Sequence, residues 1–403
     1  MRDAAGIYMR SGLIMRACRT AFWPLLFVRL VTEVDLSALQ LVLLGTVFEL
    51  TILVSEIPTG VVADIYSRRL SVILTFLIGG VAMIMSALVS PYWLLVISQV
   101  LVGFASTFET GAETAWITDE LGSAEEAEHL ILQRGQYQLF AGIVGVLGFS
   151  LLAWGTTLST ALAATGVVYL LWGGVLIMTM PENNFTRTEG EGWAEFVGML
   201  RGGFAEAKGV AALRILVTVI FIGGLAKEAI DRLDVKRLVD VGLPDDVNEA
   251  VLIGVIVAAK LFFAIAFVKV ARTRARGKSA VLAMTLLLVG IAAGVLVLAH
   301  VDLLAIAALG LIFQGGFHFA TEPLVTTWAN TFASSKARAT VHSFVGQAEA
   351  FGEIIGGVIL GTVAEVFTVP TAMTISAVLF LIAAALAFTT RGVWDSSLQQ
   401  VAG

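Results

Sequence analysis

Long apolar runs separated by short polar stretches extend over the whole chain. About 20 apolar residues in a helix are enough to cross a hydrocarbon core of ~30 Å. Ala, Leu, Met and Gly are spread through the runs without strict alternation, which favours helices over membrane strands. The pattern predicts an all-α integral membrane protein with 12 transmembrane helices, near residues 8–32, 38–63, 70–90, 92–118, 131–154, 159–180, 211–234, 248–271, 278–299, 302–331, 338–364 and 369–391.

The longest polar stretch divides these spans into two sets of six. Within it, several apolar residues share one helical face, which predicts a short amphipathic helix on the membrane surface: Trp193, Phe196, Val197, Leu200 and Phe204. We therefore expect an N-terminal six-helix bundle over 1–180, a cytoplasmic linker over 181–210 and a C-terminal six-helix bundle over 211–403.

A faint internal repeat indicates that the two bundles are pseudo-symmetric copies. Glu113 in the fourth span and Glu322 in the tenth are 209 residues apart (322 minus 113). Gln136 in the fifth and Gln347 in the eleventh are 211 apart (347 minus 136). Glycine pairs within the spans lack the Lys-Ser/Thr of a phosphate loop, and we expect them to allow close helix packing.

Composition and charge exclude several classes of protein. The chain is 58% hydrophobic and 14% charged, whereas soluble domains carry about 25% charged residues. The net charge of −6 offers no basic face for nucleic acid. Cys18 is the single cysteine, which excludes an intrachain disulfide and a Cys-based metal cluster. With four separated histidines, no nucleophile–base set or metal site stands at one depth, so we expect no enzyme.

Basic residues predict the orientation. If the N-terminus is cytoplasmic, 17 of the 25 Lys and Arg residues fall on the cytoplasmic side, as the positive-inside rule requires. No small-residue cleavage site follows the N-terminus. We expect a multi-pass protein of the cell membrane, acting as a monomer, with both termini cytoplasmic.

Charges within the spans are the candidate functional groups. Each ionised side chain near mid-bilayer costs roughly 2.5–3.5 kcal/mol, so these groups must pair, bind a proton or line a wet cavity. Four pairs are spaced to share a helix face: Glu109 with Glu113, His318 with Glu322, Glu349 with Glu353, and Glu49 with Glu56. Adjacent carboxylates repel, which makes them candidate proton carriers; alternatively, each simply hydrogen-bonds a neighbouring helix.

The cations within the spans have two interpretations each. Arg16 either extends to the membrane interface or reaches a cavity, where it meets an anionic substrate group or Glu49; for Arg19 we favour the interface. Lys260 needs a carboxylate partner, with Glu322 and Glu228 as candidates. Lys227–Asp231 and Glu228–Arg232 are expected to be helical ion pairs near the outer end of their span.

The segment Pro58–Arg69 contains Gly60, Asp64, Arg68 and Arg69 with the spacing Gly-x3-Asp-x3-Arg-Arg. It resembles the loop between helices 2 and 3 of major facilitator superfamily transporters. The resemblance implies that the glycine permits a close turn and that the aspartate faces the amino end of the eleventh helix. It also implies that the arginines latch the cytoplasmic side. Two positions depart from the family pattern: Ile65 replaces a basic residue and Ser67 a glycine.

The general appearance is similar to bacterial members of the superfamily assigned to drug efflux. Drug–proton antiporters typically carry an arginine in helix 4 and a Gly-Pro pair in helix 5. This chain has Gln99 near the first position and Gly145-Val-Leu-Gly148 at the second.

We therefore predict a secondary transporter that works by alternating access in the lipid bilayer. Its favoured activity is proton-coupled efflux of hydrophobic or cationic small molecules, with no cofactor beyond the proton gradient. Surplus Glu in a cavity attracts cations. The alternative is a metabolite or nutrient symporter that holds an anionic substrate with Arg16 and Lys260. A transport-incompetent sensor or scaffold is a further alternative, although the chain has no large cytoplasmic module.

Overall fold

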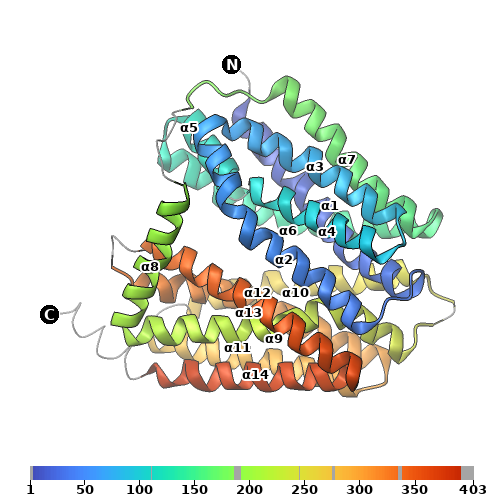
Figure 1. Cartoon of the computed structure of the whole chain (residues 1–403). Coiled ribbons are helices and arrows are strands. Elements are labelled where there is room, and N and C mark those ends of the chain that lie inside the picture. The colour runs from blue at the N-terminus through green and yellow to red at the C-terminus, as the bar shows by residue number, and fades with distance from the viewer. Residues whose placement is uncertain are drawn as a thin grey trace. The chain divides into compact units, whose positions relative to one another are not determined.

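The computed structural model describes residues 3–109, 111–185, 192–244, 246–274, 277–334 and 338–391, and within them the regular structure is entirely helical. Figure 1 shows the helices, with the α-helices labelled. Their bounds are α1 Ala4–Thr32, α2 Ala38–Val61, the π-helix η1 Val62–Tyr66, α3 Arg68–Leu88, α4 Tyr92–Glu109, α5 Ala112–Leu121, α6 Ala124–Gly155, α7 Leu158–Thr179, α8 Gly192–Gly209, α9 Ala211–Val241, α10 Glu249–Arg274, α11 Gly277–His300, α12 Leu304–Phe332, α13 Arg338–Val366 and α14 Val369–Thr389.

The twelve predicted spans are confirmed. In the described part of the chain, nine helical segments are long and apolar enough to cross a membrane. The other three predicted spans are α1, α9 and α13, which contain charged residues along their length. The fourth span is interrupted: it consists of α4 and α5, which are separated near Gly111.

The chain forms two compact units. The N-terminal unit comprises Met1–Asp35, Val47–Glu195 and Asp245–Ala258. The C-terminal unit comprises Leu36–Thr46, Phe196–Pro244 and Ala259–Gly403. The division passes within α2 and α10, so it follows contacts rather than helix ends. The predicted domain limits at 180 and 211 stay a prediction based on sequence.

The same helix pairs pack together in both units. In the N-terminal unit, α1 packs against α6, and α3 packs against α7 and α4. In the C-terminal unit, α9 packs against α13, and α11 packs against α14 and α12. The packing therefore repeats after six transmembrane spans, as a duplicated unit requires.

One arginine contact is repeated almost exactly. Arg29 on α1 donates to Val89 O at the end of α3 (3.1 Å), and Arg237 on α9 donates to Leu298 O near the end of α11 (3.0 Å). The offsets are 208 (237 minus 29) and 209 (298 minus 89). Both guanidinium groups are buried and satisfy carbonyl groups that a helix end leaves without an intrahelical donor. The contact ties the first and third helices of each unit.

Glycines set the closest helix approaches. A Cβ atom on Gly145 of α6 would lie 2.2 Å from Ala17 O on α1, and one on Gly356 of α13 would lie 2.3 Å from Leu225 O on α9. These contacts are also equivalent, since the offsets are 208 for Ala17 and Leu225 (225 minus 17) and 211 for the two glycines (356 minus 145). Small residues at these positions let the backbones touch, as predicted.

The predicted linker contains the helix α8. In the C-terminal unit, the rings of Phe204 on α8 and Phe344 on α13 are 6.4 Å apart, and Glu206 accepts a hydrogen bond from the backbone N–H of Ser334 (3.1 Å). Three predicted members of the apolar face, Trp193, Phe196 and Leu200, have side chains outside the described residues.

We predict that Gly145→Ala destabilises the protein by about 1–3 kcal/mol, because the added methyl group overlaps backbone atoms that cannot simply rotate away. Gly148→Ala is the matched control on the same helix, since a Cβ atom there meets nothing within 4 Å. Thermal unfolding in detergent measures both. Equal melting temperatures for the two variants would contradict the close α1–α6 packing.

Candidate functional site

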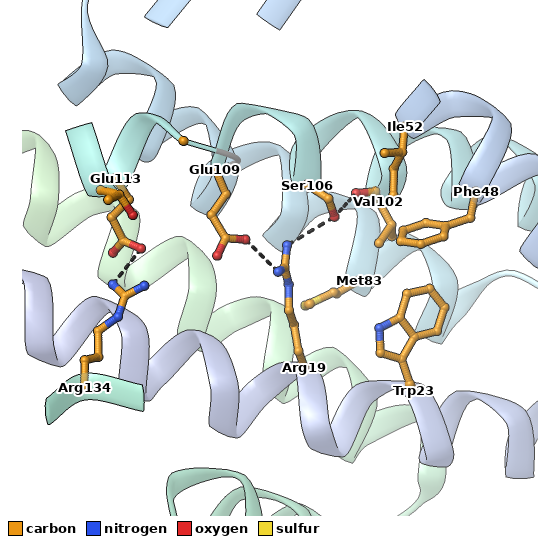
Figure 2. Close-up of a pocket in the computed structure, with 12 residues that line it drawn as sticks. Arg19, Trp23, Phe48, Ile52, Met83, Val102, Ser106, Glu109, Glu113 and Arg134 are labelled. Atoms are coloured by element: carbon orange, nitrogen blue, oxygen red, sulfur yellow. Dashed lines mark hydrogen bonds and ion pairs between the residues drawn. The ribbon is translucent and has the colours of Figure 1, made fainter. Parts of the chain in front are cut away.

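A cavity of about 450 Å³ lies within the N-terminal unit. Trp23, Phe48, Ile52, Met83 and Val102 form its apolar wall. The remaining lining residues are polar or small: Arg19, Ser106, Glu109, Gly111, Glu113, Thr114 and Arg134. Figure 2 shows the two arginines facing the two glutamates, with the aromatic rings at one end. The cavity thus combines two opposite-charge pairs with an apolar surface.

Arg19 and Glu109 form the first of these pairs. Arg19 Nη1 lies 2.6 Å from Glu109 Oε2, and Nη2 donates to Ser106 Oγ (3.1 Å). Our expectation that Arg19 extends to the membrane interface was wrong. Because α1 begins at Ala4, Arg19 lies roughly 22 Å along the helix, too deep for its side chain to reach that end.

Glu113 and Arg134 form the second pair. Glu113 is 3% exposed, and its Oε2 lies 2.7 Å from Arg134 Nη1. The guanidinium group of Arg134 lies over the Tyr8 ring, 3.9 Å from its centroid. The absence of a side chain at Gly12 leaves room for the stem, since a Cβ atom there would lie 2.5 Å from Arg134 Cδ. Because α6 begins at Ala124, it carries Arg134 into the N-terminal unit.

The break between α4 and α5 changes the expected geometry of Glu109 and Glu113. Glu109 is the last residue of α4, and Glu113 lies in the first turn of α5. Gly111 between them has φ +78°, a left-handed conformation that costs other residues roughly 1–2 kcal/mol. The prediction that these two glutamates share one helix face was therefore wrong. Each binds a different arginine in the same cavity.

A second cavity, of about 290 Å³, lies within the C-terminal unit. His318 and Glu322 on α12 and Glu349 on α13 provide its titratable groups. The prediction that His318 and Glu322 share a face is confirmed, because both line this cavity. The rest of the lining is mostly apolar and comes from α9, α11, α12, α13 and α14: Val219, Ile220, Gly223, Met284, Leu288, Ile291, Phe319, Thr321, Val325, Val345 and Phe380.

Lys227 connects this cavity to a carboxylate cluster. Its Nζ lies 2.5 Å from Glu353, 3.6 Å from Asp231 and 4.0 Å from Glu349. The predicted Lys227–Asp231 pair is confirmed, as is the shared face of Glu349 and Glu353. Lys227 lies near the middle of α9, however, because this helix continues to Val241. The additional contacts join α9 to α13.

The Arg232–Glu228 pair is also confirmed, with Arg232 Nε donating to Glu228 Oε1 (2.9 Å). Within the described residues, the expected ion pair of Lys260 with Glu322 or Glu228 is not found. Instead, the Lys260 stem lies against Gly315 of α12, where a Cβ atom would approach its Cδ to 2.4 Å.

Two further predicted residues lie outside the two cavity linings. Arg16 and Glu49 occupy half-buried positions on α1 and α2, while their neighbours Arg19 and Phe48 line the N-terminal cavity. The spacing of residues along each helix could not show which of these neighbouring positions faces the cavity.

The comparisons with known proteins agree with this architecture. The model of the Major Facilitator Superfamily matches residues 11–352. The chain belongs to the Major Facilitator Superfamily. This membership and the helical architecture make it a transmembrane transporter, and the predicted fold class is confirmed.

Solved superfamily structures match the fold over nearly the whole chain. A mutant of nucleoside transporter NupG has a TM-score of 0.78 at 13% identity, covering 98% of this chain and 100% of its own. A bacterial homolog of the human lysosomal transporter Spinster has 0.74 at 15%, covering 98% and 97%. A mutant peptide transporter POT has 0.79 at 10%, covering 98% and 96%. No curated protein matches the chain.

The loop that resembles the superfamily motif contacts the rest of the N-terminal unit. Arg68 forms an ion pair with Asp119 on α5 and lies 3.9 Å from Asp64. Arg69 Nη2 donates to Ile177 O on α7 (2.6 Å). A Cβ atom on Gly60 would meet nothing within 4 Å, so within the described residues no steric contact explains this glycine.

Ser67, the position that departs from the motif, has a structural role. Its hydroxyl oxygen accepts from the backbone N–H of Leu70 (2.9 Å), which caps the start of α3. The same hydroxyl donates to Glu182 Oε2 (2.6 Å). Glu182 also accepts from the backbone N–H of Arg69 (2.9 Å). The loop is therefore fastened both to α5 and to the segment after α7.

We predict that Arg134→Met destabilises the protein by roughly 3–5 kcal/mol, because it leaves Glu113 buried without its counter-ion. Adding Glu113→Gln to Arg134→Met should restore part of this loss. Arg10→Met, which removes an exposed pair with Asp3, is the control and should cost at most ~1 kcal/mol. Thermal unfolding would contradict the assignment if the double variant were less stable than Arg134→Met.

Proposed function

We propose that this superfamily member is a proton-coupled secondary transporter that exports hydrophobic or cationic small molecules by alternating access. In this proposal the protein acts as a monomer in the cell membrane, with both termini cytoplasmic. It requires no cofactor other than the proton gradient. Glu113 carries the coupled proton.

The observation that carries the proposal is the environment of Glu113. Its carboxylate is buried and faces Arg134 at 2.7 Å, yet neither oxygen has a well-aligned hydrogen bond within the described part of the chain. A buried pair held chiefly by charge loses most of its attraction when the carboxylate is protonated. Proton binding would therefore release Arg134 and α6 from α5.

The α5 helix supports a link between this proton and the cytoplasmic loops. Glu113 lies in its first turn, and Asp119 near its end binds Arg68. Trp116 Nε1 donates to Pro181 O (2.7 Å), and Glu120 accepts from the backbone N–H of Asn183 (2.6 Å). A rigid movement of α5 would pull on the loops around it. We assign Gly60, Asp64, Arg68 and Arg69 to gating on this basis.

The N-terminal cavity supports a cargo with an apolar part. Trp23 and Phe48 are in edge-to-face contact, with centroids 5.0 Å apart. They lie at the end of the cavity beside the Arg19–Glu109 pair (Figure 2). Aromatic and aliphatic walls with a few polar groups are typical of small-molecule sites.

We predict that Glu113→Gln abolishes transport driven by a pH gradient, because the neutral amide cannot exchange a proton. Proteoliposomes with an imposed gradient and ethidium as the probe measure this, with an expected loss of at least about tenfold in rate. Ethidium exchange without a gradient should persist. Glu126→Gln, at an exposed position on α6, is the control. Undiminished gradient-driven transport by Glu113→Gln would refute proton coupling at this residue.

The second candidate function is symport of an anionic metabolite. The two guanidinium groups of Arg19 and Arg134 in the N-terminal cavity favour it, because arginine binds carboxylates with paired N–H donors. Arg16 and Lys260, the residues first assigned to the anion, lie outside the linings of both cavities.

Arg19→Gln discriminates between the two functions. If the cargo is an anion, the substitution should lower uptake of benzoate, the test acid, at least about tenfold. In that case neither the unmodified protein nor the variant transports ethidium. If the cargo is a cation, benzoate uptake is absent from the unmodified protein as well. Parallel uptake assays of both probes in one proteoliposome preparation decide the matter.

A further inference from the structure

The cavity of the C-terminal unit has a charge balance different from that of its N-terminal counterpart. Glu322 is exposed in it, and no ion pair or hydrogen bond to Glu322 is found within the described residues. Glu349, its second carboxylate, is 41% exposed and lies 4.0 Å from Lys227. Lys227 is much closer to Glu353, at 2.5 Å. The cavity therefore presents two carboxylates that water reaches: Glu322, with no ion pair among the described residues, and Glu349, whose one ion pair is the long contact with Lys227.

The duplicated architecture explains how this imbalance arises. Glu322 is equivalent to Glu113, at the offset of 209 (322 minus 113). Arg134, the partner of Glu113, has Val345 as its equivalent at the α6–α13 offset of 211 (345 minus 134). Val345 lines the C-terminal cavity but carries no charge. The glutamate is present in both units, whereas its arginine is present in one.

The surroundings favour an organic ligand rather than water alone. Leu288, Ile291 and Phe380 are fully buried or nearly so and form apolar wall, and Phe319 adds an aromatic side chain. Apolar walls of low dielectric strengthen attraction between a carboxylate and a cation, and aromatic faces attract quaternary ammonium groups. A volume of about 290 Å³ lies at the small end of the range for ligand pockets.

We propose that this cavity binds a small organic cation, with the ammonium group between Glu322 and Glu349 and the apolar body against Leu288, Ile291 and Phe380. The bound cation supplies the positive charge that Arg134 supplies in the other unit. The claim that the bound cation is the transported cargo rests on the proposed function. The claim that the cavity binds a cation does not depend on it.

Lys227 acts in this site as a built-in competitor. Its ammonium group is shared among three carboxylates, of which Glu349 also lines the cavity. A bound cation near Glu349 attracts this carboxylate away from Lys227. Lys227 then keeps only its ion pairs with Glu353 and Asp231. Ligand binding is thereby connected to the contact between α9 and α13.

Binding to the purified, full-length protein tests the site without any transport. Benzyltrimethylammonium is the probe, and phenylmethanesulfonate is an anion of similar size. Isothermal titration calorimetry should detect binding of the cation and at least about tenfold weaker binding of the sulfonate. Glu322→Gln should weaken cation binding about tenfold, which corresponds to about 1.4 kcal/mol. Glu126→Gln should bind as the unmodified protein does.

A second variant tests the site independently, in case Glu322→Gln does not fold. Val325→Trp fills the cavity and keeps every charged group; Val325 is only half-buried, so a larger side chain has room to adjust. It should abolish cation binding while the melting temperature stays near that of the unmodified protein. Unchanged cation affinity in either variant, or equal affinity for the sulfonate, overturns the proposal. The proposal is also overturned if Glu109→Gln loses cation binding while Glu322→Gln keeps it, because that result places the cation in the N-terminal unit.

These outcomes are independent of the proton-coupling experiment. If Glu113→Gln transports normally but Glu322→Gln binds the cation weakly, the site stands and the proposed coupling residue fails. The reverse result supports coupling at Glu113 and removes the cation site.

Discussion

The high cost of an ionised group among apolar helices determines most of what is distinctive in this structure. Each unit contains several charges at mid-helix positions, and a buried charge is tolerated only when a counter-ion or water faces it. Arg19 meets Glu109, Arg134 meets Glu113, and Lys227 meets three carboxylates. These contacts fix which helix faces point inward, and therefore where the two cavities form.

The duplication supplies a second constraint, because both units must keep the same helix pairs in contact. The repeated arginine–carbonyl contacts of Arg29 and Arg237 and the repeated glycine approaches preserve that packing. The charged linings have diverged on this common frame. The N-terminal cavity is balanced by two arginines, whereas the C-terminal cavity keeps its glutamate without the equivalent arginine. Divergence of charge on a constant frame gives the two cavities different electrostatic surroundings.

The interruption of the fourth span is the main local departure from regular helix geometry. Gly111 adopts a left-handed conformation, which separates Glu109 from Glu113 and directs them to different partners. The short α5 that results carries Glu113 in its first turn. Residues farther along α5 contact the start of α3 and the segment after α7. The nucleoside, Spinster-like and peptide transporters named above share the fold at 10–15% identity, which leaves the cargo to be argued from this chain's own residues.

The sequence by itself determined the number, type and approximate limits of the spans, because an apolar run of fixed length is a local property that the bilayer thickness dictates. It also indicated the duplication and the local i,i+4 pairs, such as Lys227 with Asp231 and His318 with Glu322. Only the tertiary structure decided which partner each charge has, since Arg19, Arg134 and Glu353 meet groups 90, 21 and 126 residues away along the chain. The break at Gly111 was equally hidden, because a glycine in an apolar run is compatible with a continuous helix until the packing around it selects a left-handed backbone.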